Sequence, residues 1–281
     1  MFEELTELEK LVAVQRYEFS RAARLDLIVF ILQTVTAVLA VLSVALPQGL
    51  LSGVLAPTSL GVIVAAFWFN HQSRLHRIIS EKARRATLLV GGLGLALSQT
   101  EIRRLTSATG ASPEELMDMH DPTFFATAEG PGVKRATDML EESAFWSTYL
   151  FRASGDRVQW WMAIAVSMTA ICFLLALQVF HSADTSLQVK FFSAIASSIV
   201  SIEFLTRCLL YRIAARDTDS VVVKLDHVRE LNYPQDGFLW AMTEYNSAVE
   251  SAPLMAPGVY KKNKSRIEQI WKDKGKKRGA A

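Results

Sequence analysis

Cysteine is scarce in this sequence, and charged residues are absent from long stretches of it. Two cysteines among 281 residues are too few for a disulfide scaffold or a four-cysteine zinc site. A formal net charge of +2 argues against a general nucleic-acid-binding protein, which needs a basic surplus to neutralise phosphates. No Asp, Glu, Lys or Arg occurs from Leu27 to Ser73, from Val158 to Ala183 or from Phe191 to Ile202. Such uncharged stretches exclude an ordinary soluble domain and indicate a membrane protein.

Four apolar segments are long enough to cross a bilayer as helices, which takes about 20 residues. They run from Leu27 to Leu46, Leu50 to Phe69, Val158 to Phe180 and Phe191 to Tyr211. We therefore predict an all-α membrane protein with four transmembrane helices in two hairpins, a helical cytoplasmic insert and a helical tail. The predicted parts are an amphipathic leader helix (1–26), a first hairpin (27–69), the insert (70–157), a second hairpin (158–211), the tail (212–271) and a basic, disordered terminus (272–281).

The distribution of basic residues predicts the orientation of these spans. All but one of the 30 Lys and Arg residues lie in the leader, the insert or the stretch from Arg207 onward, and Lys190 is the exception. Basic residues concentrate on the cytoplasmic side of membrane proteins. We therefore expect both termini and the insert to be cytoplasmic.

The sequence offers no motif for catalysis, metal binding or a cofactor. The segment from Gly91 to Gly94 lacks the Lys-Ser/Thr that completes a phosphate-binding loop, so close packing explains its glycines better. No His pairs with a Cys or carboxylate at metal-ligand spacing, and no Ser–His–Asp arrangement can be assigned. We place His71 and His76 at the surface or at headgroup level, and we expect a protein that is not an enzyme.

The fourth span contains an ionisable pair, Glu203 and Arg207, which share one helix face because they are four residues apart. Ionisable groups in hydrocarbon are costly and usually have a partner or a purpose. Either Arg207 extends to the inner interface and neutralises Glu203, or the pair lines a polar path or an inter-subunit contact. Small residues form separate faces suited to close helix packing; these are Ser193, Ser197 and Ser201 in the fourth span and Ala163, Ser167 and Ala170 in the third.

The tail contains two apolar stripes at helical spacing and a basic end. Val221, Leu225 and Val228 mark the first stripe, Phe238, Met242, Tyr245 and Val249 mark the second, and Pro234 separates them. The basic end includes Lys272, Lys274, Lys276, Lys277 and Arg278. Basic residues close to a bilayer bind anionic lipid headgroups, so we assign headgroup contact to these five. Binding of a nucleotide or another anion remains the alternative.

Two stretches resemble a known family. One, from Glu142 to Arg152, includes Phe145 and Trp146; the other, from Tyr245 to Tyr260, contains Pro253 and Pro257 before a run of basic residues. Both resemble elements of the SMODS-associating four-transmembrane effector family of bacteria, which also has two hairpins of spans, a cytoplasmic insert and a helical tail. The family is encoded beside cyclic-oligonucleotide synthases. The family's aromatic-aromatic-acid triplet is represented here by Phe145-Trp146 followed by Ser147.

The resemblance implies a non-enzymatic effector that oligomerises and permeabilises the membrane in antiviral defence against phage. A cyclic nucleotide second messenger or a partner protein would trigger it. The alternative is a structural or scaffolding membrane protein whose cytoplasmic helices recruit partners. A transporter is disfavoured because the sequence lacks an inverted repeat of broken helices. The expected partners are the lipid bilayer and further copies of the chain, not nucleic acid.

Overall fold

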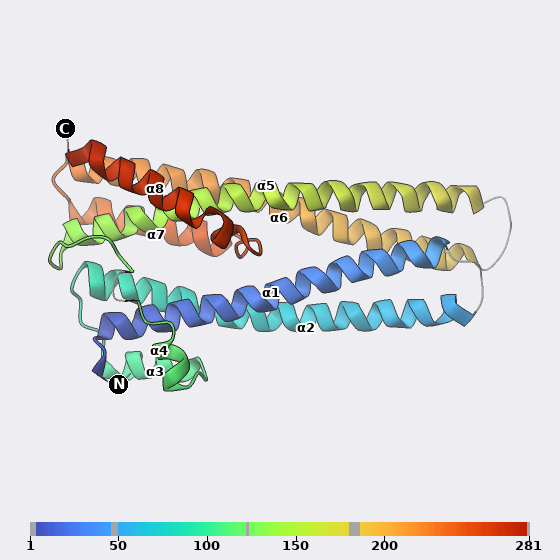
Figure 1. The fold of residues 1–281 in the computed structure, drawn as a ribbon, viewed down its shortest axis with the longest axis horizontal. Coiled ribbons are helices and arrows are strands. Elements are labelled where there is room, and N and C mark those ends of the chain that lie inside the picture. Colours follow the sequence, from blue (N-terminus) through green and yellow to red (C-terminus); the bar gives the residue numbers. More distant parts are fainter. Residues whose placement is uncertain (1–3, 46–49, 122–123, 180–185, 280–281) are drawn as a thin grey trace. The chain divides into compact units, whose positions relative to one another are not determined.

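The computed structural model of the chain is helical, and it describes residues 4–45, 50–121, 124–179 and 186–279. Its elements, in chain order, are α1 (Glu7–Ala45), α2 (Leu50–Thr87), the π-helical turn η2 (Leu88–Gly92), α3 (Gln99–Ala108), α4 (Pro113–Met117), α5 (Val133–Val179), α6 (Ser186–Glu230), α7 (Gln235–Ser251) and α8 (Val259–Gly279) (Figure 1). Side chains at 40–45, 50–53, 55–57, 165, 168–169, 172–173, 175–179, 186–201 and 277–279 lie outside the description. No strand occurs among the described residues, so the predicted all-α class is confirmed.

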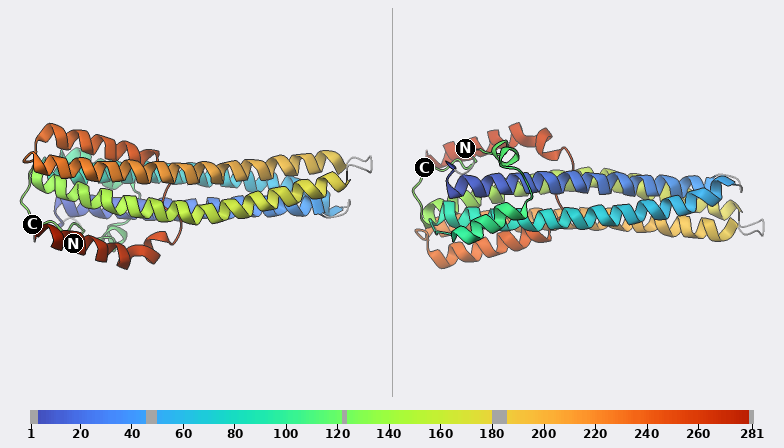
Figure 2. Two further views of the ribbon diagram at one scale, coloured as in Figure 1. Left: turned by 90° about the horizontal axis from the view of Figure 1, so that it is seen from above. Right: turned by 90° about the horizontal axis from the view of Figure 1, so that it is seen from below.

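The chain divides into two compact units. Unit 1 consists of Met1–Ala23, Ser73–Ala153 and Leu210–Ala281, and unit 2 consists of Arg24–Gln72 and Ser154–Leu209. The predicted leader, insert and tail supply most of unit 1, and the two predicted hairpins supply unit 2, with boundaries shifted by a few residues. Helices α3, α4, α7 and α8 belong wholly to unit 1, as the ribbon views in Figures 1 and 2 allow the reader to follow.

The core of unit 1 includes side chains of α1, α5, α6 and α7. Leu11 of α1, Leu140 of α5, Leu225 of α6 and Phe238 of α7 are completely buried. A large apolar side chain contributes roughly 1.5–3 kcal/mol when it is fully buried. The two stripes predicted in the tail are confirmed, because every member is buried: Val221, Leu225 and Val228 on α6, and Phe238, Met242, Tyr245 and Val249 on α7.

The glycines of the η2 turn are positions of close approach. A Cβ on Gly92 would lie 2.9 Å from both the Cα and the Cβ of Ala136 on α5, and a Cβ on Gly91 would lie 2.6 Å from a methyl group of Leu8. The carbonyl of Gly92 also accepts a hydrogen bond of 2.8 Å from the N–H of Gly132. The interpretation of these glycines as packing residues is therefore confirmed.

The prediction for His76 is wrong. Its Nδ1 lies 2.7 Å from Oε2 of Glu18, and the side chains of His76 and Glu18 are only 14% and 0% exposed. Burial raises the pKa of the Glu18 carboxyl above its ordinary value of 4.5, although the hydrogen bond with His76 acts in the opposite direction. The pairing joins α1 to α2 and has no signature in local spacing. His71, in contrast, is exposed as expected.

The C-terminal helix is longer than the sequence predicted. We expected a disordered terminus over 272–281, but α8 runs from Val259 to Gly279. Val259 and Ile267 are buried, with 3% and 2% of their surfaces exposed. These contacts, together with a charged contact at Lys274 described below, supply stabilisation that the basic composition of the segment did not reveal.

Unit 2 contains the segments that we predicted to span a membrane. Among the described residues, one stretch, Glu7–Leu39 of α1, is long and apolar enough to cross a bilayer. Its 18-residue apolar window has a mean hydropathy of 1.8, and 28% of that window is buried. Parts of the other three predicted spans lie outside the described side chains. The four-span topology therefore remains a prediction.

Candidate functional site

A charged cluster joins α1 to α6 within unit 2. Nη1 of Arg207 lies 3.2 Å from both carboxylate oxygens of Asp26. The same guanidinium donates from Nη2 and Nε to Oε1 of Glu203, at 3.3 and 3.4 Å. The side chains of Asp26 and Arg207 are only 11% and 14% exposed, whereas that of Glu203 is 40% exposed. The guanidinium of Arg207 therefore joins two carboxylates, and both Arg207 and Asp26 are nearly enclosed.

A polar and aromatic shell surrounds this cluster. The side-chain amide of Gln33 on α1 donates a hydrogen bond to Oε2 of Glu203. Phe30, also on α1, makes edge-to-face contacts with Trp161 and Phe204, with ring centroids 5.2 and 5.5 Å apart. Asp26, Phe30 and Gln33 share one face of α1 because they are spaced four and three residues apart. That face presents the partners of Glu203 and Arg207 in register.

Sequence reasoning found half of this cluster. Glu203 and Arg207 were predicted as a pair on one helix face, whereas Asp26 was given no role. A signal was present, because Asp26 and Arg207 both stand close to the predicted cytoplasmic ends of their spans. Two opposite charges at similar depth in neighbouring helices are candidates for pairing.

Of the two predicted small-residue faces, the structure describes the side chains of the one on α5. Ala163, Ser167 and Ala170 on α5 are all exposed. They therefore do not form a buried contact within the described part of the chain. The side chains of Ser193, Ser197 and Ser201 lie outside the described residues. Close packing through either face stays a prediction, and for α5 the exposed face would have to meet another molecule.

The two stretches that resemble the effector family meet in unit 1. Trp146 of α5 and Tyr260 of α8 have ring centroids 6.0 Å apart. Phe145, which is 7% exposed, contacts Tyr149 at 4.8 Å and Trp271 of α8 at 5.0 Å. Residues more than 100 positions apart in the sequence thus form one aromatic contact zone between α5 and α8.

The remaining motif residues border this zone. Nη2 of Arg152 lies 3.1 Å from Oδ2 of Asp219 on α6. Pro253 and Pro257 are partly buried in the connection between α7 and α8. The hydroxyl of Tyr211 donates to the carbonyl of Leu254 and so holds this connection against α6. The prolines keep the connection out of a helical conformation, since a residue before proline avoids the α region.

A buried carboxylate, Glu141 of α5, lies between two cations. Oε2 of Glu141 accepts from Nη2 of Arg229, and its Oε1 accepts from Nζ of Lys274, both at 2.6 Å. Its side chain is 1% exposed. Burial alone would lower the pKa of Arg229, but the hydrogen bond and charge of Glu141 raise it above its ordinary value. Arg229 also pairs with Asp138 at 3.1 Å and with Asp226 at 3.0 Å.

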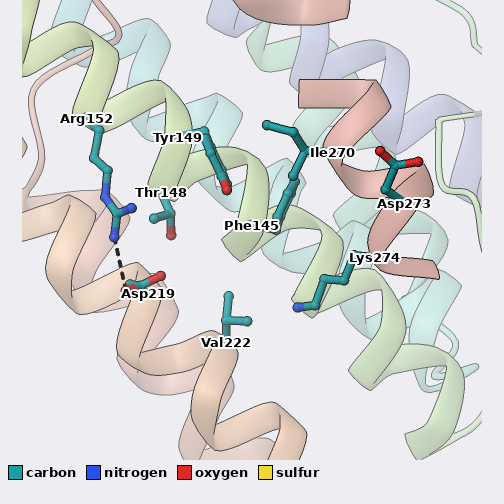
Figure 3. A pocket seen from close by; sticks show the side chains of 9 residues that line it. All are labelled: Phe145, Thr148, Tyr149, Arg152, Asp219, Val222, Ile270, Asp273 and Lys274. Carbon is teal, nitrogen blue, oxygen red and sulfur yellow. Dashed lines mark hydrogen bonds and ion pairs between the residues drawn. The ribbon is translucent and has the colours of Figure 1, made fainter. Parts of the chain in front are cut away.

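Two cavities lie beside the end of α8. The larger, of about 470 Å³, is lined by side chains of α5, α6 and α8, among them Tyr149, Arg152 and Lys274 (Figure 3). The second, of about 450 Å³, is lined by residues 126–130, by Trp271 and by acidic residues of α5. One of these acidic residues is Glu142. Burial raises the pKa of its carboxyl above the ordinary 4.5, although the hydrogen bond donated by the N–H of Ala126 acts in the opposite direction.

The five predicted headgroup residues do not share one environment. Lys272 and Lys276 are exposed, whereas Lys274 forms an ion pair with Glu141 and its side chain is 26% exposed. The side chains of Lys277 and Arg278 lie outside the described residues. Within the described part of the chain, no group of three or more His, Cys, Asp or Glu side chains is placed to hold a metal ion.

The comparisons with known proteins add nothing to this geometry. No protein-family model matches the chain, and neither a curated protein nor a solved structure matches it.

Proposed function

We propose that this chain is a four-span integral membrane protein of the bacterial inner membrane that oligomerises and permeabilises the bilayer in defence against phage. Unit 2 would form the two membrane hairpins, and unit 1 would be the cytoplasmic sensor. A cyclic nucleotide or a partner protein bound to unit 1 would shift the population toward the permeabilising form, provided that it binds that form more tightly.

The distribution of side chains in unit 2 is the observation that supports membrane insertion most strongly. Large apolar side chains are exposed on all four of its helices, including Ile31 and Val35 on α1, Phe67 and Trp68 on α2, Trp160 and Ile164 on α5, and Ile202 and Leu209 on α6. Asp26 and Arg207, in contrast, are nearly enclosed. A water-soluble bundle has the opposite arrangement, with charges outward and few large apolar patches.

The effector role is supported by the resemblance and by the meeting of its two stretches at α5 and α8. A ligand or partner bound at that zone would contact the C-terminal helix directly. Oligomerisation is supported by the exposed face of Ala163, Ser167 and Ala170, because small residues let helices approach closely in a membrane. A single four-helix unit encloses little space, so a conducting path would form between copies.

Topology reporters test membrane insertion. A reporter fused after Ala281 and one inserted at Gly130 should both read cytoplasmic, and one inserted at Ser182 should read external, because basic residues favour the cytoplasmic side. The measurement is the ratio of alkaline phosphatase to green fluorescent protein activity for each fusion. An external signal at Gly130 would overturn the four-span arrangement.

Dye leakage tests permeabilisation. The purified protein in liposomes with a trapped fluorescent dye should release it at a rate that rises more steeply than linearly with the protein-to-lipid ratio, because several copies are needed for each path. Added cyclic dinucleotides of adenine and guanine are expected to increase the rate at a fixed ratio. Liposomes that stay sealed at every ratio, with and without these nucleotides, would contradict the effector proposal and favour the scaffolding alternative.

A further inference from the structure

The sequences of the four predicted spans contain only two charged residues, Glu203 and Arg207. The structure places these two side chains in different environments within unit 2. The side chain of Arg207 is 14% exposed and lies against Asp26, which is 11% exposed, whereas the side chain of Glu203 is 40% exposed. A path that runs through the spans along the outer face of α6 therefore meets one exposed charge per copy, and that charge is negative.

The charges of this cluster do not cancel. The single guanidinium of Arg207 is shared between two carboxylates, those of Asp26 and Glu203. The other group bonded to Glu203 is the side-chain amide of Gln33, which is neutral. The ionised cluster therefore has one more negative charge than positive charges. Because Asp26 and Arg207 are enclosed together, the surplus is presented to the surroundings at Glu203.

Glu203 lies too far along its predicted span for the carboxylate to reach the cytoplasmic interface. It stands eight residues before Tyr211, the last residue of that span, which corresponds to about 12 Å of helix. Long Lys and Arg side chains can extend to an interface, but a glutamate side chain is too short to cover this distance. Ionisable groups inside a membrane almost always face a bundle interior or a water-filled cavity. The exposed side of Glu203 therefore indicates contact with water between copies and not with lipid.

We propose that Glu203 makes the path between copies selective for cations over anions. The proposal rests on the proposed function above and adds the class of solute that the path conducts. Copies that turn this face of α6 toward a shared path place one Glu203 carboxylate each at the same depth, and a ring of carboxylates favours cations. Thr206, which is exposed three residues further along, adds a hydroxyl oxygen to the same face of the helix.

Reversal potentials in planar bilayers test this selectivity. The full-length protein would be added to bilayers of phosphatidylcholine, whose headgroups have no net charge, with KCl at different concentrations on the two sides and the cyclic dinucleotides of the leakage assay present. We expect a reversal potential displaced toward the equilibrium potential of K⁺ and away from that of Cl⁻. The displacement should shrink when KCl is raised on both sides at a constant ratio, because salt screens exposed charges.

Three variants assign the selectivity to Glu203. Glu203→Gln removes the charge at nearly constant shape, so its reversal potential should fall to near zero in the same gradient. Glu203→Asp keeps the charge and should keep the preference for K⁺. The matched control is Glu230→Gln, the same change on the same helix but outside the predicted span, where the side chain is 76% exposed. This control should have the reversal potential of the wild type.

Each contrary result has a distinct meaning. A wild-type reversal potential at zero or on the Cl⁻ side overturns the selectivity, whatever the variants do, and leaves permeabilisation intact. A preference for K⁺ that survives in Glu203→Gln assigns the selectivity to other groups and also overturns the proposal. If Glu203→Gln does not conduct, the wild type and Glu203→Asp decide, since both should prefer K⁺. Bilayers that stay insulating with wild-type protein contradict the permeabilising function itself, and the selectivity fails with it.

Discussion

Replacing Arg207 with methionine should destabilise unit 2 by about 3–5 kcal/mol, the usual cost of removing one partner from a buried ion pair. The change would leave Asp26, which is 11% exposed, without its counter-charge. It would also remove both hydrogen bonds from Arg207 to Glu203. The measurement is thermal unfolding of the purified protein in detergent, together with the amount that reaches the membrane. A variant that unfolds at the wild-type temperature would show that the cluster has no structural role.

The two acidic partners of Arg207 should differ in importance. Asp26→Asn should cost several-fold more stability than Glu203→Gln, because Asp26 is nearly enclosed whereas the Glu203 side chain is 40% exposed. An exposed ion pair contributes only about 0–1 kcal/mol. The double variant Asp26→Asn with Arg207→Met should be more stable than Arg207→Met alone, because the nearly enclosed charge of Asp26 is gone and the carboxylate that remains, Glu203, is 40% exposed. Equal effects of Asp26→Asn and Glu203→Gln would reject this ranking.

The same cluster links stability to the proposed activity. If Glu203 takes part in a path between copies, Glu203→Gln should reduce dye leakage while leaving the unfolding temperature nearly unchanged. Exchanging the two charges, Glu203→Arg with Arg207→Glu, should not restore activity, because the new glutamate would lie beside Asp26. Full activity of the exchanged pair would contradict the contact between Arg207 and Asp26.

Replacing Arg229 with methionine should have the largest effect in unit 1, again about 3–5 kcal/mol. Arg229 neutralises Glu141, Asp138 and Asp226 together. Without it, the 1% exposed carboxylate of Glu141 would lose the cation 2.6 Å from its Oε2. The measurement is the free energy of unfolding of the full-length protein in chemical denaturant. We expect it to be highest for wild type, intermediate for Arg229→Met plus Glu141→Gln, and lowest for Arg229→Met.

A matched control for Arg229 lies on the same helix. The Arg216 side chain is 79% exposed and lies 3.2 Å from the adjacent Asp217. Arg216→Met removes the same charge and nearly the same volume, and it should change stability by less than about 0.5 kcal/mol. If Arg216→Met and Arg229→Met lower the free energy of unfolding equally, the loss of stability reflects net charge and not the buried network around Glu141.

Much of the helical organisation of this chain could be predicted because it is local. The stripe from Phe238 to Val249 recurs at helical spacing, and all four of its members are buried. The start of α4 is equally local, because Ser112 forms a capping box with Glu115. Both features depend on residues within a few turns of one another, so hydrophobic period and capping preference were sufficient.

The pairings between distant segments could not be predicted in the same way. Glu18 and His76 are 58 positions apart, Asp26 and Arg207 are 181 apart, and Glu141 and Lys274 are 133 apart. In each case many other charged residues offered the same chemistry. Which two meet depends on the rotation and register of packed helices, and neither quantity can be read from spacing along one helix.

The sequence by itself determined the helical class, the apolar character of the segments in unit 2 and the buried faces of the tail, because each follows from the composition and period of a single segment. The tertiary structure decided which charges are enclosed and which are free. It paired Arg207 with Asp26 as well as Glu203, and it kept the basic end of α8 helical by giving Lys274 a buried partner. A charge is stable in a low-dielectric interior only beside its counter-charge, and the folded arrangement of helices alone supplies that neighbour.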